Sequence, residues 1–237
     1  MKLGAASICV FLALLAMSAP PALLAQNAEA NPTQNPAQNP TIPTITYERL
    51  WDAYTPQDIN ITVEQTGRAR YISTNPLKTP DEKQTNPDYT LEFTMSERTR
   101  QKLFRDAKEA NYFHGDFSYK KHPVASTGKK TLTYADQDRH YQTTFDYSDN
   151  KAISEISDIL QGISYTLEHG RKLQYLHRFD KLGLEDELKG MEEAAKTENL
   201  QELQLIAPTL KSIADDTAVL NIARERAKRL LQKIPSR

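Results

Sequence analysis

The chain has 237 residues, in which 30 Lys and Arg nearly balance 31 Asp and Glu, and it contains one cysteine. The formal net charge of −1 provides no global field toward nucleic acid or an anionic membrane, so any partner must be recognised locally. A single cysteine cannot form an intramolecular disulfide, and we therefore expect ordinary core packing to hold the fold.

Residues 1–25 have the layout of a secretory signal peptide. A positive charge at Lys2 precedes an apolar run, and small residues at Ala25 or Ala30 offer cleavage sites. Cleavage at either position would remove the only cysteine, Cys9. The sequence thus predicts an extracytoplasmic protein, periplasmic or secreted.

Two alternatives for this N-terminal segment stay open. Cys9 could carry a lipid, although Ile8 stands where lipoprotein processing requires a small residue. The uncharged span 3–26 could instead be retained as a membrane anchor, although Pro20 and Pro21 interrupt it as a helix. Contact with a membrane is expected only if the N-terminal segment is retained.

Residues 26–46 are predicted to be a disordered linker. Asn and Pro recur with a period of four between Asn31 and Pro40. A segment with so little apolar content cannot offset its ordering entropy, and its prolines stiffen it toward polyproline II.

Residues 47–170 are predicted to form an α+β domain. Apolar residues alternate with polar ones along five segments, 59–64, 68–74, 89–95, 130–134 and 140–147, which predicts five strands. A helix is expected to begin after Ser96 as its N-cap, and the spacing of apolar residues over 153–167 predicts a second helix that ends at Gly170. Because consecutive hairpin strands pair antiparallel, the expected order is β-β-β-α-β-β-α.

Residues 171–237 carry no strand pattern and are predicted to form a helical extension. Apolar spacing indicates helices near 173–182, 184–195, 200–210 and 217–233. The last helix is expected to bury one stripe of apolar residues: Leu220, Ala223, Ala227, Leu230, Leu231 and Ile234.

The order of these elements resembles a family of secreted bacterial domains of unknown function. The resemblance covers roughly residues 58–169 and rests on the Thr66-Gly67 turn, the strand that leads into Ser96 and the aromatic cluster at 112–117. It implies a secreted protein of Gram-negative origin and no particular activity. Members of that family carry Thr-Asp before the second hairpin, whereas here Thr127 is followed by Gly128.

Several acidic residues and histidines lie in predicted loops and turns and could be considered as metal ligands: His114, Asp116, His122, Asp136, Asp138 and His140. Their spacing matches neither a helical histidine pair nor a calcium loop. Asp136 and Asp138 are residues that a hairpin turn favours in any case. We therefore expect a structural turn, with no metal and no other cofactor.

No pattern for nucleophilic catalysis is present. The chain has no Gly-x-Ser-x-Gly motif, and its five histidines show no recognisable partner spacing. The basic last helix, with cations from Arg224 to Lys233, could bind a membrane surface, but packing in the core is favoured. Asp215 and Asp216 could be paired catalytic carboxylates, but capping of that helix is favoured. Four aromatic residues could likewise form a ligand face or simply sheet core: Tyr134, Tyr141, Phe145 and Tyr147.

The sequence as a whole favours an exported cell-envelope protein without enzymatic activity, acting through contacts with a protein or an envelope component. The alternative is an extracytoplasmic hydrolase or metal-dependent enzyme with a site assembled from loops. The two differ in surface, because enzymes usually have a concave pocket with convergent polar groups.

Overall fold

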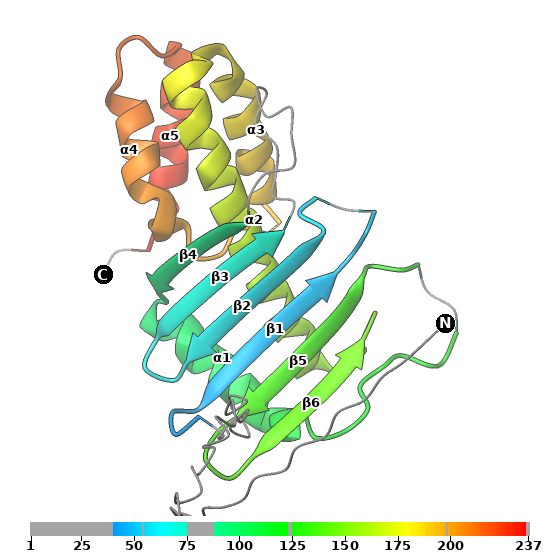
Figure 1. Ribbon diagram of the computed structural model, residues 1–237. Coiled ribbons are helices and arrows are strands. Elements are labelled where there is room, and N and C mark those ends of the chain that lie inside the picture. Colours follow the sequence, from blue (N-terminus) through cyan, green and yellow to red (C-terminus); the bar gives the residue numbers. More distant parts are fainter. Residues whose placement is uncertain (1–39, 54, 75–87, 123–124, 198, 236–237) are drawn as a thin grey trace, which may run out of the picture. The chain divides into compact units, whose positions relative to one another are not determined.

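The computed structural model describes residues 40–235 except 54, 75–87, 123–124 and 198 (Figure 1). The predicted signal peptide and most of the predicted linker lie outside the described residues. Among the helices that are described, none combines the length and apolar content that crossing a membrane would require.

The fold is α+β, as predicted, and is built on one antiparallel sheet of six strands in the order β4-β3-β2-β1-β5-β6 (Figure 1). The sequence predicted about five strands. The observed strands are β1 (Thr44–Leu50), β2 (Asp58–Glu64), β3 (Arg68–Thr74), β4 (Tyr89–Thr94), β5 (Lys129–Ala135) and β6 (His140–Phe145).

The strand missing from the prediction, β1, lies at the centre of the sheet, where it pairs with both β2 and β5. Residues 44–46, which we assigned to the linker, belong to it. Its side chains alternate, but only Ile45 and Tyr47 are apolar core residues, because the next inward position holds Arg49. Prolines at 40 and 43 precede it directly, so the apolar pattern was too short to separate β1 from the linker.

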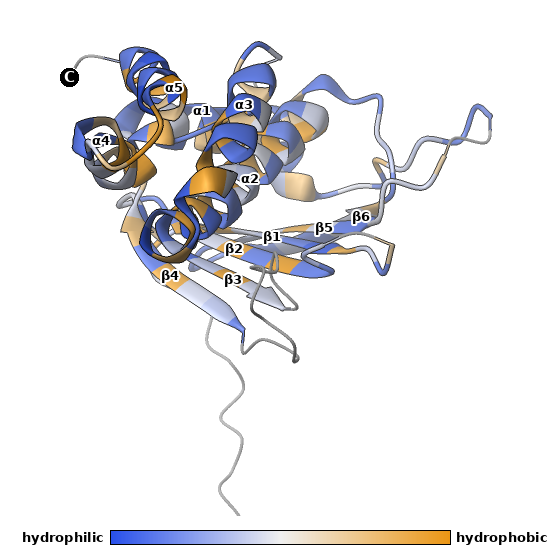
Figure 2. Cartoon of the chain, turned by 90° about the horizontal axis from the view of Figure 1, so that it is seen from above, coloured by the Kyte–Doolittle hydropathy of each residue, from blue (hydrophilic) through white to orange (hydrophobic). Residues whose placement is uncertain are grey.

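Helices α1 (Glu97–Glu109) and α2 (Lys151–Phe179) cover one face of the sheet (Figure 2). Ser96 caps α1 as predicted, since its side chain accepts a hydrogen bond from the Thr99 N–H. A short 3-10 turn, η1 (Asn111–Phe113), follows α1. The first hydrophobic core lies between sheet and helices, and its largest fully buried side chains are Tyr47, Tyr71, Phe113, Ile45, Ile61, Leu103, Leu132, Ile153, Ile156, Leu160, Ile163 and Leu167.

The prediction that a helix ends at Gly170 is wrong. A single helix, α2, runs through this glycine for 29 residues and replaces the two helices expected at 153–167 and 173–182. The predicted domain boundary at 170/171 therefore falls inside a continuous helix. Gly170 has a packing role instead, because a Cβ there would lie 2.3 Å from Cγ2 of Ile206.

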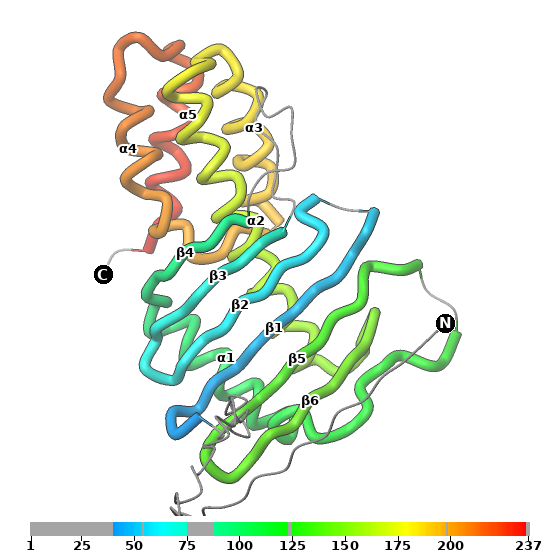
Figure 3. Tube along the Cα trace, viewed as in Figure 1, coloured from blue at the N-terminus to red at the C-terminus, as the bar shows by residue number. Residues whose placement is uncertain are grey.

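The second half of α2 packs with α3 (Leu184–Ala194), α4 (Ala207–Asp215) and α5 (Asn221–Gln232) (Figure 3). We call α3 to α5, with this half of α2, the helical unit. Two 3-10 turns, η2 (Lys181–Gly183) and η3 (Leu203–Ile206), connect its helices. A second core fills it, with fully buried side chains at Leu173, Leu184, Leu188, Met191, Leu210, Ile213, Ala223, Ala227 and Leu230.

Helix α5 starts later than predicted. Ala223, Ala227 and Leu230 are buried, but Leu220 precedes the helix and is 48% exposed, so it does not belong to the buried stripe. Asp215 and Asp216 do not cap α5 either. Asp215 is the last residue of α4, and Asp216 accepts a hydrogen bond from the Ala218 N–H within the turn.

Two cations of α5 bind the neighbouring helix α3. Arg226 pairs with Glu185 and Glu192 of α3, and Arg229 Nε lies 2.6 Å from Glu192 Oε1. These contacts support the interpretation of α5 as a packed helix of the second core.

Candidate functional site

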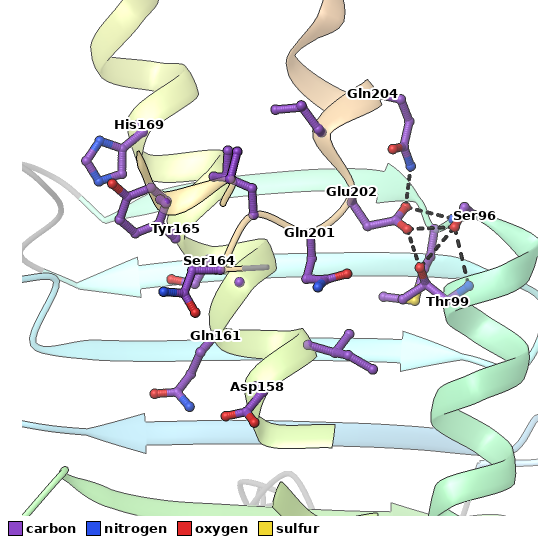
Figure 4. Close-up of a pocket in the computed structure, with 18 of the residues that line it drawn as sticks. Ser96, Thr99, Asp158, Gln161, Ser164, Tyr165, His169, Gln201, Glu202 and Gln204 are labelled. Atoms are coloured by element: carbon purple, nitrogen blue, oxygen red, sulfur yellow. Dashed lines mark hydrogen bonds between the residues drawn. The ribbon is translucent and has the colours of Figure 1, made fainter. Parts of the chain in front are cut away.

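A groove of about 1730 Å³ runs along α2 on the side facing the N-terminus of α1 (Figure 4). Its lining comes from several parts of the chain: the end of β1 and the loop after it, the start of α1, one stripe of α2 and residues 194–204. Segments more than a hundred residues apart in sequence thus form one surface.

One wall is a stripe of four side chains on α2: Asp158, Gln161, Tyr165 and His169. They recur every three or four residues and so lie on one side of the helix, one above the other (Figure 4). The opposite stripe of α2 supplies apolar residues to the first core. The polar stripe is therefore the part of α2 that does not pack in the first core and can contact a ligand.

Residues 199–204, here called the strap, cross α2 between these side chains. Close approach is possible because α2 has a glycine at the crossing point. A Cβ on Gly162 would lie 2.6 Å from Cγ of Gln201, and the Gln201 N–H reaches the Gly162 carbonyl at 3.5 Å. The strap thereby places Gln201 in the middle of the groove (Figure 4).

Glu202 anchors the strap to the N-terminus of α1. Its carboxylate accepts hydrogen bonds from the Ser96 N–H (2.8 Å), the Ser96 hydroxyl (2.6 Å) and the Thr99 hydroxyl (2.5 Å). A negative charge at a helix N-terminus is stabilised by the helix dipole and by the unpaired N–H groups there. Gln204 Nε2 donates a further hydrogen bond at 2.6 Å, and Glu202 itself has a φ of +55°, which several independent contacts must hold in place.

A histidine paired with a carboxylate stands at one end of the groove. His169 Nδ1 binds Oε1 of the buried Glu187, Lys172 Nζ lies 2.6 Å from Glu187 Oε2, and the Tyr165 ring stacks on the imidazole at 3.9 Å. Burial by itself would raise the pKa of Glu187, but the hydrogen bonds and charges of His169 and Lys172 outweigh it and lower the pKa. The pairing leaves Nε2 as the nitrogen of His169 available to a ligand.

The other end of the groove is mainly charged. Lys102 of α1 binds Glu155 of α2, and Arg49 lies 5.7 Å from the Trp51 ring. Asp158 is exposed. Partial desolvation nevertheless raises the pKa of its carboxyl group, although the positive charge of Lys130 acts to lower it. Cations and anions are about equally represented along the groove, so its walls favour a ligand without a large net charge.

The residues that the sequence singled out lie elsewhere. The His114 ring packs against the Tyr141 ring at a tilt of 49° with the centroids 4.6 Å apart, and His122 contacts the Tyr119 ring at 5.0 Å. His140 lies exposed at the start of β6. Within the described residues, no three His, Cys, Asp or Glu side chains are grouped as metal ligands would be.

The turn between β5 and β6 is organised by Asp136. Its Oδ1 accepts hydrogen bonds from the N–H groups of Asp138 (3.0 Å) and Arg139 (2.8 Å), and its Oδ2 accepts one from the Tyr134 hydroxyl. This is the hydrogen bonding expected of a structural aspartate turn. Tyr134 and Tyr141 are directly opposite each other on β5 and β6, and Phe145 lies on the same side of β6, so these three share one face of the sheet. Tyr134 and Phe145 are buried in the core, whereas Tyr147 lies beyond the end of β6 and is exposed.

The groove residues were missed for two reasons. The spacing of Asp158, Gln161, Tyr165 and His169 was visible as the polar side of an amphipathic helix, a pattern that solvent-facing stripes share. The pairing of His169 with Glu187, and the crossing of α2 by Gln201, depend on how the chain folds back, for which the sequence has no local pattern.

No family model matches the chain, and no curated protein matches it.

Proposed function

We propose that this protein is an exported, non-enzymatic component of the bacterial cell envelope that binds an extended glycan chain in the groove along α2. The observation that carries the proposal is that the α2 stripe of Asp158, Gln161 and Tyr165 lines the same large groove as Gln201 of the strap, which lies on α2 beside it (Figure 4).

The size of the groove supports a chain as ligand. Pockets for small molecules are typically about 300 to 1,000 Å³. The groove, at about 1730 Å³, exceeds this range. It has room for several sugar units laid end to end.

The chemistry of the walls supports a sugar. Each sugar hydroxyl is both donor and acceptor, and the amides of Gln161 and Gln201 together with the Asp158 carboxylate offer both roles. Tyr165 is partly buried and stacks on His169, and the part of its ring that lines the groove provides an apolar surface that a sugar ring can contact. A peptide that binds by strand pairing fits less well, because most of the groove lining belongs to helices and to the strap, whose backbones do not form a strand edge.

Export is supported by the signal-peptide layout of residues 1–25. Intact mass and N-terminal sequencing of protein from the envelope fraction test it. A new N-terminus between residues 26 and 31 is expected. A chain that still begins at Met1 would show that the segment is not cleaved and would favour its retention as a membrane anchor.

The binding proposal is tested with an array of neutral and acidic oligosaccharides, followed by calorimetric titration of the best ligand. Gln161→Ala and Tyr165→Ala should weaken binding about tenfold each, as truncation of a central contact does. Gln142→Ala and Tyr147→Ala remove the same residue types from exposed positions outside the groove and should leave affinity unchanged. Absence of any oligosaccharide ligand, or equal effects of both pairs, would contradict the proposal.

A second candidate, hydrolysis of the bound glycan or of an ester on it, is favoured by the pairing of His169 with Glu187. A carboxylate that binds Nδ1 orients the imidazole so that Nε2 can accept a proton from water. Mass spectrometry of ligands incubated with the protein separates the two functions. Products that disappear in His169→Ala would establish the enzyme, and unchanged ligands with intact binding would establish the binding protein.

A further inference from the structure

The described helices all lie on one side of the sheet and leave its other face open (Figure 2). A pocket of about 280 Å³ lies on this open face, at the end of the sheet where β1 and β3 stop and β2 and β5 start. This volume is close to the lower limit of about 300 Å³ for small-molecule sites. We call it the sheet pocket, and it is distinct from the groove, which runs along α2 on the covered side.

The strand register fixes the arrangement of the side chains that line the sheet pocket. One row crosses β3, β2, β1 and β5 through successive register partners: Thr74, Asp58, Leu50 and Lys129. Each of these residues is next in sequence to a buried residue of the covered face, so strand alternation directs the row to the open face. A second row, two residues further into the strands, consists of Ile72, Asn60, Glu48 and Thr131.

Two opposite charges flank an apolar centre in the first row. Leu50 is 50% exposed and stands between Asp58 and Lys129, and Ile72 of the second row adds another apolar side chain to the lining. Neighbouring strands lie about 4.8 Å apart, so the two charged residues are separated by about 10 Å across the sheet. Within the part of the chain that the structure describes, neither of the two charges has an ion-pair partner.

Two polar atoms at the Asp58 side of the sheet pocket also lack partners. Asp58 Oδ1 and Thr74 Oγ1 are shielded from solvent, and no hydrogen bond to either is formed among the described residues. Such atoms are rare in folded proteins, because an unmade hydrogen bond costs free energy. The χ2 torsion of Asp is broad, so the Asp58 carboxylate can turn to meet a donor that a ligand brings into the pocket.

We propose that the sheet pocket binds a zwitterion of the size of a dipeptide. Its ammonium group lies between Asp58 and Thr74, its carboxylate pairs with Lys129, and its apolar side chains contact Leu50 and Ile72. An ammonium group has three donors, which is enough for the Asp58 carboxylate and the Thr74 hydroxyl together. Two residues of extended chain span about 7 Å, and the ionic contacts and the flexible Lys129 side chain bridge the remaining separation.

Ligands with a single charge fit the sheet pocket less well. A simple amine would leave Lys129 unpaired, and a simple carboxylate would leave Asp58 unpaired. The inference does not depend on the proposed glycan binding, because Arg49 is the one described residue that lines both sites, and its buried side chain belongs to the covered face.

Calorimetric titration of the full exported chain with the dipeptide Leu-Leu tests the site. A Kd between about 10 μM and 1 mM is expected for a pocket of this size. N-acetyl-Leu-Leu lacks the ammonium group and Leu-Leu amide lacks the carboxylate. Each should bind about tenfold more weakly than Leu-Leu, because each leaves one charge of the pocket unpaired.

Variants of the two charged residues assign each end of the ligand. Asp58→Asn and Lys129→Gln should each weaken binding of Leu-Leu about tenfold without lowering the melting temperature, since neither charge has a partner in the free chain. Asp58→Asn should not weaken binding of N-acetyl-Leu-Leu further, and Lys129→Gln should not weaken binding of Leu-Leu amide further.

Asp186→Asn and Lys189→Gln are the matched controls, because they remove exposed charges of α3 outside the sheet pocket and should bind Leu-Leu as the wild type does. The proposal would be overturned by the absence of Leu-Leu binding at about 10 mM peptide. Equal affinity for the three peptides, or equal effects of the pocket and control variants, would overturn it as well.

Discussion

Ile206 of η3 packs directly on the backbone of Gly170 in α2, so that a Cβ at position 170 would lie 2.3 Å from Ile206 Cγ2. This contact joins the segment after the strap to the middle of α2. Because α2 has helical geometry on both sides of Gly170, the glycine is required by the close approach and not by its backbone conformation.

Gly170→Ala should therefore destabilise the protein by about 1 to 3 kcal/mol, the usual cost of overpacking a core. Gly190→Ala is the matched control: it lies in α3 with nothing within 4 Å of its would-be Cβ, and it should stabilise by up to about 1 kcal/mol. Urea denaturation measures both. If the cost is steric, Ile206→Ala should remove most of it in a double-mutant cycle.

Glu202→Gln should destabilise the protein by about 2 kcal/mol. The carboxylate accepts from the Ser96 N–H and from two hydroxyls, and a Gln amide nitrogen can accept none of these hydrogen bonds. Glu193→Gln removes a carboxylate from an exposed pair with Lys196 and should change stability by less than about 0.5 kcal/mol. Equal melting temperatures for the two variants would contradict the role of Glu202 as an anchor.

Leu220→Asp should change stability by no more than about 0.5 kcal/mol, because Leu220 is 48% exposed. Leu230→Asp, which places a charge in the second core, should cost about 3 kcal/mol or more. Thermal unfolding of the two variants compares the exposed Leu220 with the buried Leu230. A large loss in Leu220→Asp would mean that residue 220 packs inside the helical unit after all.

Stability should fall as the pH drops below about 4.5, in part because of Glu187. The contacts with His169 and Lys172 lower the pKa of this carboxyl in the folded chain below the ordinary value of 4.5. Between the two pKa values the unfolded chain binds a proton that the folded chain does not, so acid favours unfolding. The stabilisation is complete above pH 4.5 and is lost as the pH falls through the folded pKa.

Denaturation of wild type and Glu187→Gln at pH 6 and at pH 3 measures this contribution. At pH 6 the variant should be less stable by about 1 to 2 kcal/mol, the net value of hydrogen bonds to a charged group. At pH 3 the difference should shrink. A difference that stays constant with pH would show that the effect of the variant is not electrostatic.

Much of the fold could be predicted because its signals are local. The hairpin of β2 and β3 follows from strict alternation on both sides of Thr66-Gly67, and the start of α1 follows from the capping chemistry of Ser96. The pattern failed where a tertiary contact decided the role of a residue. Arg49 occupies an inward position of β1, and Gly170 makes room for Ile206.

The candidate site was out of reach for the same reason. His169 can be recognised as a candidate functional residue only when the carboxylate that binds its Nδ1 is known. That carboxylate belongs to Glu187, which lies on another helix, 18 residues further along the chain. Leu220 likewise fits the helical spacing of the buried stripe, but α5 begins one residue after it. Local periodicity cannot place the end of a helix to within one residue.

Helix α2 runs without a break through both hydrophobic cores and connects them. Its 29 residues span about 43 Å, and its first half is buried under the sheet while its second half is buried among α3 to α5. A hinge between the two cores would require a break in α2. Because α2 is continuous, a displacement of the helical unit is transmitted along this helix to the groove.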